Sequence, residues 1–524
     1  MTTEKDKPSP GLGKIFGLVA VLTVLSKLAG LARDIIVLQY FGTSHVNDAY
    51  NYAYLLTGNI LVLFGGLGGP FHSATVAIVT PRKQSPETGK LVAQITLFTV
   101  LALAAIALVA WLLAPQLVSL IAPAPGHPPE YRHLLWSETV SQLHLMLPIV
   151  VITGVVGVSY GVLNVYGRFF WPSLSPAIAS LAIIVAVLGF ADTAGGLCLA
   201  AGTLAGALGQ MVAQLPGVAR SHLKWQLTLK PQPGLAAYFA MLWPAVVSTS
   251  VGQLTVYVDC FFTSQLQEGA WTAIVNANRL IQLPLGVLLT AMLVPILPRF
   301  TEQVTAGQTE ALKGELRRAL RFLWFLSLPL TALLLALAGP IIQLLFQRGQ
   351  FTTSSTALVT AALLFMVPSI FFYVARDLIT RVFYAHQDST TPYHVALTAI
   401  FVKAILDWSL VGPLGVGGIS LATTLITIFN LSLLAYFLRR KIGALGLGRL
   451  VKPVSVMLLA SAACGALAFT SSGWLASHLE LGPFWKLLVS VSVSSALGLG
   501  TYALICTALR LEEVQMLVRR LRPS

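Results

Sequence analysis

The stretch Leu91–Ile121, which reads LVAQITLFTVLALAAIALVAWLLAPQLVSLI, contains no charged residue. A helix that crosses a bilayer needs roughly 20 predominantly apolar residues, so this stretch alone predicts a transmembrane helix. Further uncharged runs lie at 173–191, 193–219, 322–347 and 453–477. Of all 524 residues, 56% are hydrophobic and only 10% charged, with a mean hydropathy of +0.80. Because soluble domains carry about 25% charged residues, we predict an all-α polytopic membrane protein and exclude a cytosolic enzyme, a secreted disulfide scaffold and a disordered regulator.

Weaker apolar segments bring the expected number of transmembrane helices to fourteen. Their approximate limits are 15–40, 48–79, 91–121, 138–165, 173–191, 196–219, 235–264, 271–298, 322–346, 353–384, 392–411, 415–438, 453–473 and 483–509. Cytoplasmic loops are enriched in Lys and Arg, so a correct helix count should place most basic residues on one side of the membrane. With the N-terminus inside, 24 of the 33 Lys and Arg residues fall at cytoplasmic ends, and only Arg132, Arg348 and Lys486 fall at the opposite ends. The alternation predicts that both termini are cytoplasmic, and it explains the net charge of +14 without nucleic acid.

Two similar segments, 220 residues apart, indicate an internal repeat. Gly161–Pro172 reads GVLNVYGRFFWP and Arg381–Pro392 reads RVFYAHQDSTTP, each with a polar helix end, a charged turn and a proline that opens the next helix. An even number of spans separates the halves, which predicts two pseudo-symmetric six-helix lobes of the same orientation around a central cavity. The predicted parts are a cytoplasmic tail (1–14), an N-terminal lobe (15–220), a C-terminal lobe (235–440), two additional transmembrane helices (450–510) and a cytoplasmic tail (511–524).

The remaining six basic residues fall within or at the edge of the predicted spans. They are Lys27, Arg33, Arg279, Arg376, Arg381 and Lys403. A cation at the bilayer centre costs about 2.5–3.5 kcal/mol on insertion scales, so these residues are expected to face a wet cavity. For Lys27, Arg33 and Arg279 we favour a functional role, because surplus positive charge suits an anionic substrate and Arg binds phosphate by bidentate hydrogen bonds. For Arg376 with Asp377, an ion pair that locks helices together is an equal alternative.

Two other features have both structural and functional interpretations. Lys403 and Asp407 lie four residues apart and can pair on one helix face, which is the simpler interpretation. Gly65–Pro70, GGLGGP, falls inside the second predicted span. Such a run predicts a bend, an unwound turn or a hinge, and close packing of helices is the alternative.

The motifs that are absent from the sequence exclude several classes of chemistry. There is no GxxxxGK[ST] phosphate loop, no HExxH metal motif and no CxxC pair. No paired carboxylates near a membrane face suggest a glycosyltransferase or hydrolase. We therefore predict that the protein is not an enzyme, has no metal site and needs no cofactor.

With these residues in view, the chain resembles the MurJ/MviN family of lipid II flippases, which belongs to the same superfamily as the MATE exporters. The resemblance extends over about 14–510. Its motifs are Ser26–Asp34 (SKLAGLARD) with Phe41-Gly42 and Asp48-Ala49; Leu163-Asn164 to Pro172; Asn278–Leu280 with Leu283–Val287; Phe346–Gly349 with Phe351-Thr352; and Phe383-Tyr384 with Asp388 and Thr391-Pro392.

The resemblance implies a monomeric multi-pass protein of the bacterial cytoplasmic (inner) membrane. Such a protein flips lipid II, a polyprenyl-diphosphate-linked peptidoglycan precursor, to the outer leaflet by alternating access, for cell-wall synthesis. Its partners are this lipid and the surrounding membrane lipids. By position, Lys27, Arg33, Arg279 and Arg376 match the family's cationic substrate sites. Asp48 matches an acidic site of the family, and we expect Asp34 to support the same cavity.

This chain departs from the family pattern at two places. The family's second span carries an Arg and an acidic residue, whereas Asn59–Phe71 is uncharged, so one expected phosphate ligand is missing. The acidic position three residues after Arg279 is Gln282.

A third position concerns sodium. Some members resemble sodium binders, with an acid on span seven, Asn-xxx-Asp on span eleven and Thr on span twelve. Asp259, Asp407 and Thr423 fit that pattern, but the Asn position is Lys403. We hypothesise that the Lys403 ammonium takes the place of the ion and makes this lobe independent of sodium.

Other functions remain as alternatives. A flippase or exporter for another polyprenyl-diphosphate-linked oligosaccharide needs the same cationic cavity. A MATE-type exporter of cationic drugs would need an acidic cavity, which the charge pattern does not favour. A channel is least favoured because no repeated filter motif is present.

Overall fold

The described elements are helices. The computed structural model describes residues 12–514 except 67, 222, 224, 227 and 229, and the side chains in that range except those of 12–18, 20 and 287–295. The predicted tails 1–14 and 511–524 lie mostly outside the described residues. Several basic residues at predicted cytoplasmic ends also lie outside them: Lys5, Lys7, the Lys14 side chain, Lys224, Arg519, Arg520 and Arg522. The described part of the chain contains no strand, which confirms the all-α prediction.

The chain divides into two compact units between Gln253 and Leu254, inside helix α11. The predicted division between the lobes lies earlier, in the connection between 220 and 235. The first unit contains α1 (Leu12–Phe41), α2 (His45–Leu56), α3 (Gly58–Phe64), α4 (Pro70–Val79), the 3-10 turn η1 (Thr80–Arg82), α5 (Thr88–Leu112), α6 (Ala114–Ile121), α7 (Pro129–Met146), α8 (Pro148–Val165), α9 (Phe170–Ala194), α10 (Leu197–Ala219) and the start of α11 (Leu235–Thr263). The second contains the end of α11, α12 (Ala270–Thr305), α13 (Thr309–Ala336), α14 (Ala338–Phe346), α15 (Thr353–Met366), α16 (Ser369–Ala385), α17 (Thr390–Leu414), α18 (Val416–Ile442), α19 (Gly448–His478) and α20 (Pro483–Ala508).

Among the described residues, ten helical segments are long and apolar enough to cross a membrane, with α7 and α8 taken as one segment. The pair α15 and α16, bent by 45° at their junction, makes an eleventh. The predicted spans 15–40, 48–79 and 271–298 fall on α1, on α2 to α4 and on α12, which are not among these eleven. The multi-pass membrane fold is therefore confirmed, and the count of fourteen stays a prediction.

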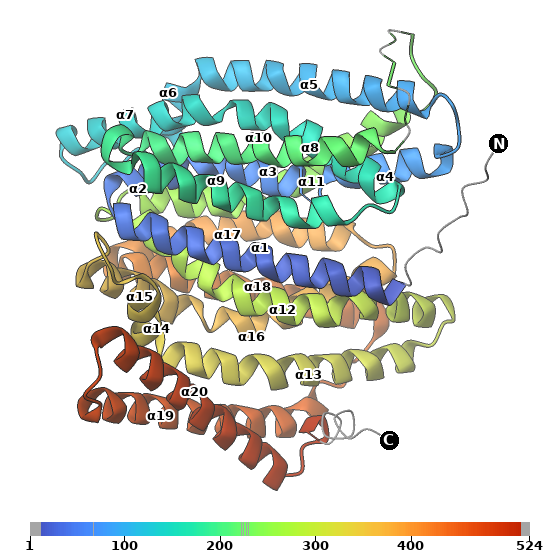
Figure 1. Cartoon of the computed structure of the whole chain (residues 1–524). Helices are drawn as coiled ribbons and strands as arrows, with labels where there is room; N and C mark the ends of the chain where they lie inside the picture. The colour runs from blue at the N-terminus through green and yellow to red at the C-terminus, as the bar shows by residue number, and fades with distance from the viewer. Residues whose placement is uncertain are drawn as a thin grey trace. The chain divides into compact units, whose positions relative to one another are not determined.

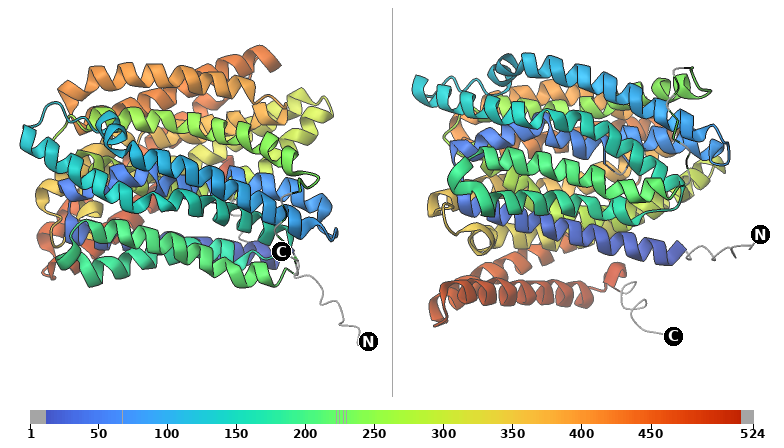
Figure 2. Two further views of the ribbon diagram at one scale, coloured as in Figure 1. Left: turned by 90° about the horizontal axis from the view of Figure 1, so that it is seen from above. Right: turned by 45° about the horizontal axis from the view of Figure 1, so that its top comes forward.

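Within each unit, small residues let neighbouring helices approach closely. Figures 1 and 2 show α9 and α10 side by side in the first unit and α19 and α20 side by side in the second. A methyl group on Gly206 of α10 would lie only 2.8 Å from the Cα atom of Ala179 in α9. In the second unit, a methyl group on Gly498 of α20 would lie 2.9 Å from the carbonyl oxygen of Cys464 in α19. Small residues at such crossings are typical of helix packing in membranes, where the hydrophobic effect cannot hold helices together.

The glycine run in the second predicted span both breaks the helix and packs closely. α3 ends at Phe64 and α4 begins at Pro70, and Gly68 has a φ of +83°, which only glycine adopts readily. Gly65 packs against α8, because a methyl group there would lie 2.8 Å from the carbonyl oxygen of Thr153. The two interpretations of this run are therefore both correct, at different glycines.

The turns in the two repeated segments have the same backbone geometry. In the first, Gly167 has a φ of +72° and the N–H of Arg168 donates to the carbonyl of Leu163 at 2.8 Å. In the second, Gln387 has a φ of +58° and the N–H of Asp388 donates to the carbonyl of Phe383 at 2.9 Å. Each position lies 220 residues after its counterpart. The structure thus repeats this turn, and helices α9 and α17 that follow it correspond residue by residue.

The second turn is also an electrostatic cap. The Asp388 carboxylate accepts hydrogen bonds from the Thr391 N–H at 2.9 Å and from the Lys441 ammonium at 2.6 Å. Partial burial alone would raise the pKa of Asp388, but these hydrogen bonds outweigh it and lower the pKa to about 2. The Asp388 carboxylate therefore stays ionised over the whole physiological pH range.

The close approach of α8 to the glycine break is testable at Gly157. A methyl group there would lie 2.5 Å from Cβ of Phe71 and 3.2 Å from Cα of Gly65. We expect Gly157→Ala to destabilise the protein by about 1–3 kcal/mol, the usual cost of overpacking, measured as a lower melting temperature in detergent. Gly189→Ala is the matched control, since a methyl group at Gly189 meets nothing within 4 Å. Equal melting temperatures for the two variants would contradict the packing.

Candidate functional site

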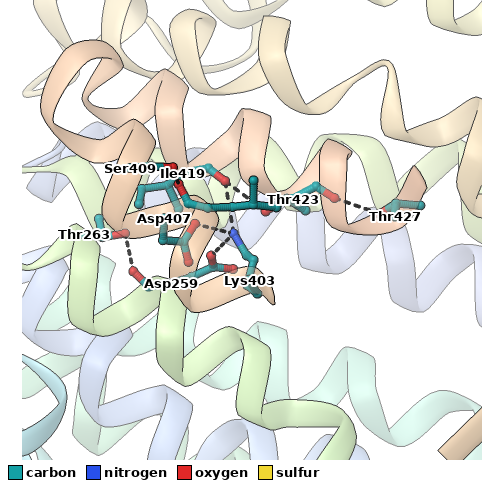
Figure 3. Close-up of polar contacts among 9 residues, drawn as sticks. Asp259, Thr263, Lys403, Asp407, Ser409, Ile419, Thr423 and Thr427 are labelled. Carbon is teal, nitrogen blue, oxygen red and sulfur yellow. Dashed lines mark hydrogen bonds and ion pairs between the residues drawn. The ribbon is translucent and has the colours of Figure 1, made fainter. Parts of the chain in front are cut away.

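A buried cluster of charges joins α11 and α17 in the second unit. Only 1% of the Lys403 side chain is exposed, against 0% for Asp407 and 14% for Asp259. The Lys403 ammonium donates to Asp407 Oδ1 at 2.7 Å and forms an ion pair with Asp259 (Figure 3). It also donates to the backbone carbonyl of Ile419 in α18 at 3.3 Å. One ammonium therefore holds two carboxylates and a carbonyl from three helices.

Thr423 belongs to this cluster only indirectly. Its hydroxyl donates to the Ile419 carbonyl at 3.1 Å, so Thr423 and Lys403 share one acceptor (Figure 3). The structure thus brings together Asp259, Lys403 and Asp407, and Thr423 is linked to them only through the shared Ile419 carbonyl. Lys403 and Asp407 meet because residues four apart share a helix face, whereas Asp259 reaches them only through the fold.

In the first unit, Arg33 is paired with its neighbour in sequence. Its Nε and Nη2 atoms both donate to Asp34 Oδ1, at 3.0 Å and 2.8 Å. The two side chains are 16% and 9% exposed, so this pair is largely removed from solvent. A guanidinium has five N–H donors, and two of them are used by this carboxylate. The other three donate to no residue that the structure describes.

Arg376, on α16, has a looser environment. Its guanidinium lies over the Tyr373 ring, 4.0 Å from the ring centroid. The Asp377 carboxylate lies 3.8 Å from Arg376 Nη2 and 4.0 Å from Arg381 Nη2, both beyond hydrogen-bond distance. Two guanidiniums therefore share one carboxylate, which leaves a surplus positive charge on this helix. The cation–π contact was not predicted, although Tyr373 lies three residues before Arg376 and the spacing could have indicated it.

The other predicted residues are placed as follows. Lys27, half-buried on α1, makes no hydrogen bond or ion pair with any residue that the structure describes. Arg279 is half-buried on α12. Asp48 is only 4% exposed and lies in the first turn of α2, where the helix dipole favours a negative charge. Lys27 and Arg33 belong to the first unit, whereas Arg279 and Arg376 belong to the second, so the four predicted cationic residues are divided between the two units.

Comparisons with known proteins give one consistent family. The family model "Lipid II flippase MurJ" matches residues 37–484. A probable lipid II flippase MurJ of Synechocystis sp. is 33% identical over 479 residues, which is 87% of this chain and 88% of that protein. A probable lipid II flippase MurJ of Thermotoga maritima is 28% identical over 505 residues, 95% of this chain and 97% of that protein.

Solved structures agree on the fold. A lipid II flippase MurJ in an inward closed conformation superposes with a TM-score of 0.75 at 21% identity, covering 94% of this chain and 99% of that one. A MATE family multidrug transporter of the MOP superfamily, in an inward-facing conformation, superposes with a TM-score of 0.67 at 16% identity, covering 82% of this chain and 98% of that one. At these identities the likeness concerns the fold alone.

The charged cluster in the second unit predicts a large effect of a single substitution. Lys403→Met would leave two carboxylates in apolar surroundings without their cation. Removing one partner of a buried ion pair costs about 3–5 kcal/mol, so we expect a much lower melting temperature in detergent. Lys452→Met, at an exposed position of α19, is the control and should change little. A Lys403→Met protein as stable as the control would show that the cluster does not stabilise the fold.

Proposed function

The chain belongs to the MurJ family of lipid II flippases, and from this premise we propose that it flips lipid II from the inner to the outer leaflet of the bacterial inner membrane by alternating access. The family model matches most of the chain, and a relative of 33% identity covers nearly all of it. The movement supplies the lipid-linked precursor for peptidoglycan synthesis. The protein is a transporter rather than an enzyme, and it acts as a monomer with both termini in the cytoplasm.

The observation that carries the proposal is the set of cationic side chains on α1 and α16. On α1, Lys27 is half-buried without a polar partner among the described residues, and Arg33 keeps three N–H donors beyond its bond to Asp34. On α16, Arg376 and Arg381 share a single carboxylate. A diphosphate presents several oxygens to such donors, and Arg binds it through two parallel hydrogen bonds.

The second span lacks the arginine that the family carries there, so the diphosphate must be bound by cationic residues on other helices. The segment Asn59–Phe71 is uncharged and contains the glycine break between α3 and α4. Either Lys27 or Arg376 can supply the positive charge that the absent arginine would have carried. The single acidic neighbour of Arg33, Asp34, orients the guanidinium by binding its Nε and Nη2 atoms through one oxygen.

Lys403 suggests that the second unit needs no sodium. Its ammonium already contacts two carboxylates and the Ile419 carbonyl, which are oxygen ligands of the kind that alkali ions need. A sodium ion there would need the same oxygen atoms that the Lys403 ammonium already contacts, so the ammonium occupies the place that the ion would take.

Depletion complementation tests the transport function. The host's own essential lipid II flippase is replaced with this chain, and external exposure of the lipid-linked precursor is measured. We expect rescue by the unchanged chain and loss of rescue by Arg33→Ala, Arg279→Ala and Arg376→Ala. Each Arg that binds the diphosphate should contribute about 1.5–3 kcal/mol, so binding of lipid II to the purified variants should weaken about 10- to 100-fold.

The control for this experiment is Arg132→Ala, at an exposed position in the first turn of α7. It should rescue growth as well as the unchanged chain. No rescue by a well-expressed unchanged chain, in a host that makes lipid II, would contradict the proposed function.

Sodium independence has its own test. The melting temperature in the presence of lipid II should be the same in NaCl and in choline chloride at equal ionic strength. Lys403→Asn removes the fixed ammonium and restores an amide oxygen, so this variant should be stabilised by sodium over choline. Stabilisation of the unchanged chain by sodium would contradict the proposal.

A further inference from the structure

The cluster around Lys403 has an unbalanced charge. Two carboxylates, Asp259 and Asp407, face one ammonium, so the three side chains carry a net charge of −1 if both acids are ionised. Asp407 and Lys403 are almost completely buried, and an uncompensated charge in such surroundings costs several kcal/mol. One further positive charge would make the cluster neutral.

On α16 and α18, no ionisable side chain that the structure describes supplies that charge. α18, which packs against α17, has none between Val416 and Ala435 and contributes only the Ile419 carbonyl and the Thr423 hydroxyl. The charged residues of α16 (Arg376, Asp377 and Arg381) pair among themselves and make no recorded bond to the cluster within the described residues. The nearest titratable neighbours on α11 are Tyr257 and Cys260, neither of which is a basic side chain.

One oxygen of the cluster is positioned to take a proton. Asp407 Oδ1 accepts from Lys403, but Oδ2 is buried and receives no hydrogen bond from any described residue. A protonated Oδ2 would become a donor, and the nearest acceptor known for it is the Asp259 carboxylate, which contacts the same Lys403 ammonium. Asp259 retains 14% exposure, so it is the least buried of the three charged side chains.

The internal repeat shows that helix packing does not require these charges. The positions 220 residues before Lys403 and Asp407 are Ile183 and Val187, which lie at the same places on α9. Both are buried in the apolar core of the first unit, where α9 packs on α10 as α17 packs on α18. The equivalent of Thr423 is Thr203, which makes the same backbone bond one turn back. The first unit therefore forms the same local structure without charged residues. Proteins in which apolar residues replace a buried ion pair are often equally stable.

We propose that the Asp259–Lys403–Asp407 cluster is a proton-binding site, in which Asp407 takes up one proton from water through Asp259 and releases it during each transport cycle. The transport part of this inference rests on the proposed function, whereas the proton site itself does not. Uptake converts the Asp407 carboxylate to a carboxylic acid and makes the cluster neutral, with no other bond made or broken. Lys403 remains the fixed cation.

The position of the cluster gives proton binding a mechanical consequence. Asp259 lies near the end of α11, the helix inside which the two compact units divide. The ion pair with Lys403 and a hydrogen bond from protonated Asp407 both hold this end of α11 to α17. Loss of the proton replaces that hydrogen bond with repulsion between two carboxylates, which loosens the hold. A proton gradient can then bias the movement of α11.

Infrared difference spectroscopy of the purified, membrane-reconstituted chain tests the site without substrate. We expect the carbonyl band of a buried carboxylic acid, which shifts in heavy water and disappears as the pH is raised. Asp407→Asn should abolish this band, and Lys403→Met should strengthen it because both acids must then be neutral. The control Asp192→Asn, at an exposed carboxylate near the end of α9, should leave the band unchanged.

A second measurement separates this inference from the proposed function. In vesicles, an imposed pH gradient should accelerate lipid II movement by the unchanged chain and by Asp192→Asn, and this response should be lost in Asp407→Asn, which still binds lipid II. A band unaffected by both Asp407→Asn and Lys403→Met overturns the proton site even if the chain flips lipid II. A band lost in Asp407→Asn, in a chain that fails to bind lipid II, would retain the site and reject the flippase.

Discussion

The bilayer offers no hydrogen-bond partner to backbone N–H and C=O groups, and the rest of this structure depends on that constraint. Helices satisfy those groups internally, so the described chain is helical almost throughout. Breaks occur where glycine allows them, as between α3 and α4, or at turns between helices. The same constraint makes each buried charge costly, which is why the few that persist in the helices indicate function.

The two units use one local structure for different purposes. The turns at Gly167 and Gln387 share a left-handed residue and the same backbone bond, and the helices that follow them align position by position. In the first unit, this helix buries Ile183 and Val187. In the second, it buries Lys403 and Asp407. A repeat of this kind lets one half retain apolar packing while the other holds a charged site.

The basic side chains inside the helices differ in how many contacts they make with the rest of the protein. Arg33 is fixed by two hydrogen bonds to Asp34, whereas Arg376 rests on an aromatic face and shares a distant carboxylate. Lys403 is held from three helices and is almost without exposure. A side chain that binds a large lipid headgroup needs N–H donors that are not already used by the protein. A side chain that couples movement to a small ion needs a site that is buried from solvent. The first description fits Arg33 and Arg376, and the second fits Lys403.

Sequence by itself determined the membrane class, the helical fold and the repeat of the turn, because apolar length and turn residues are local properties. It also placed Lys403 beside Asp407, since a four-residue spacing sets a helix face. The family resemblance indicated that Asp259 belongs with these two residues, which local spacing cannot show. Only the tertiary structure decided that the Ile419 carbonyl joins the cluster and that Arg33 binds its own neighbour. Contacts between distant helices depend on packing angles and rotamers, which no local pattern encodes.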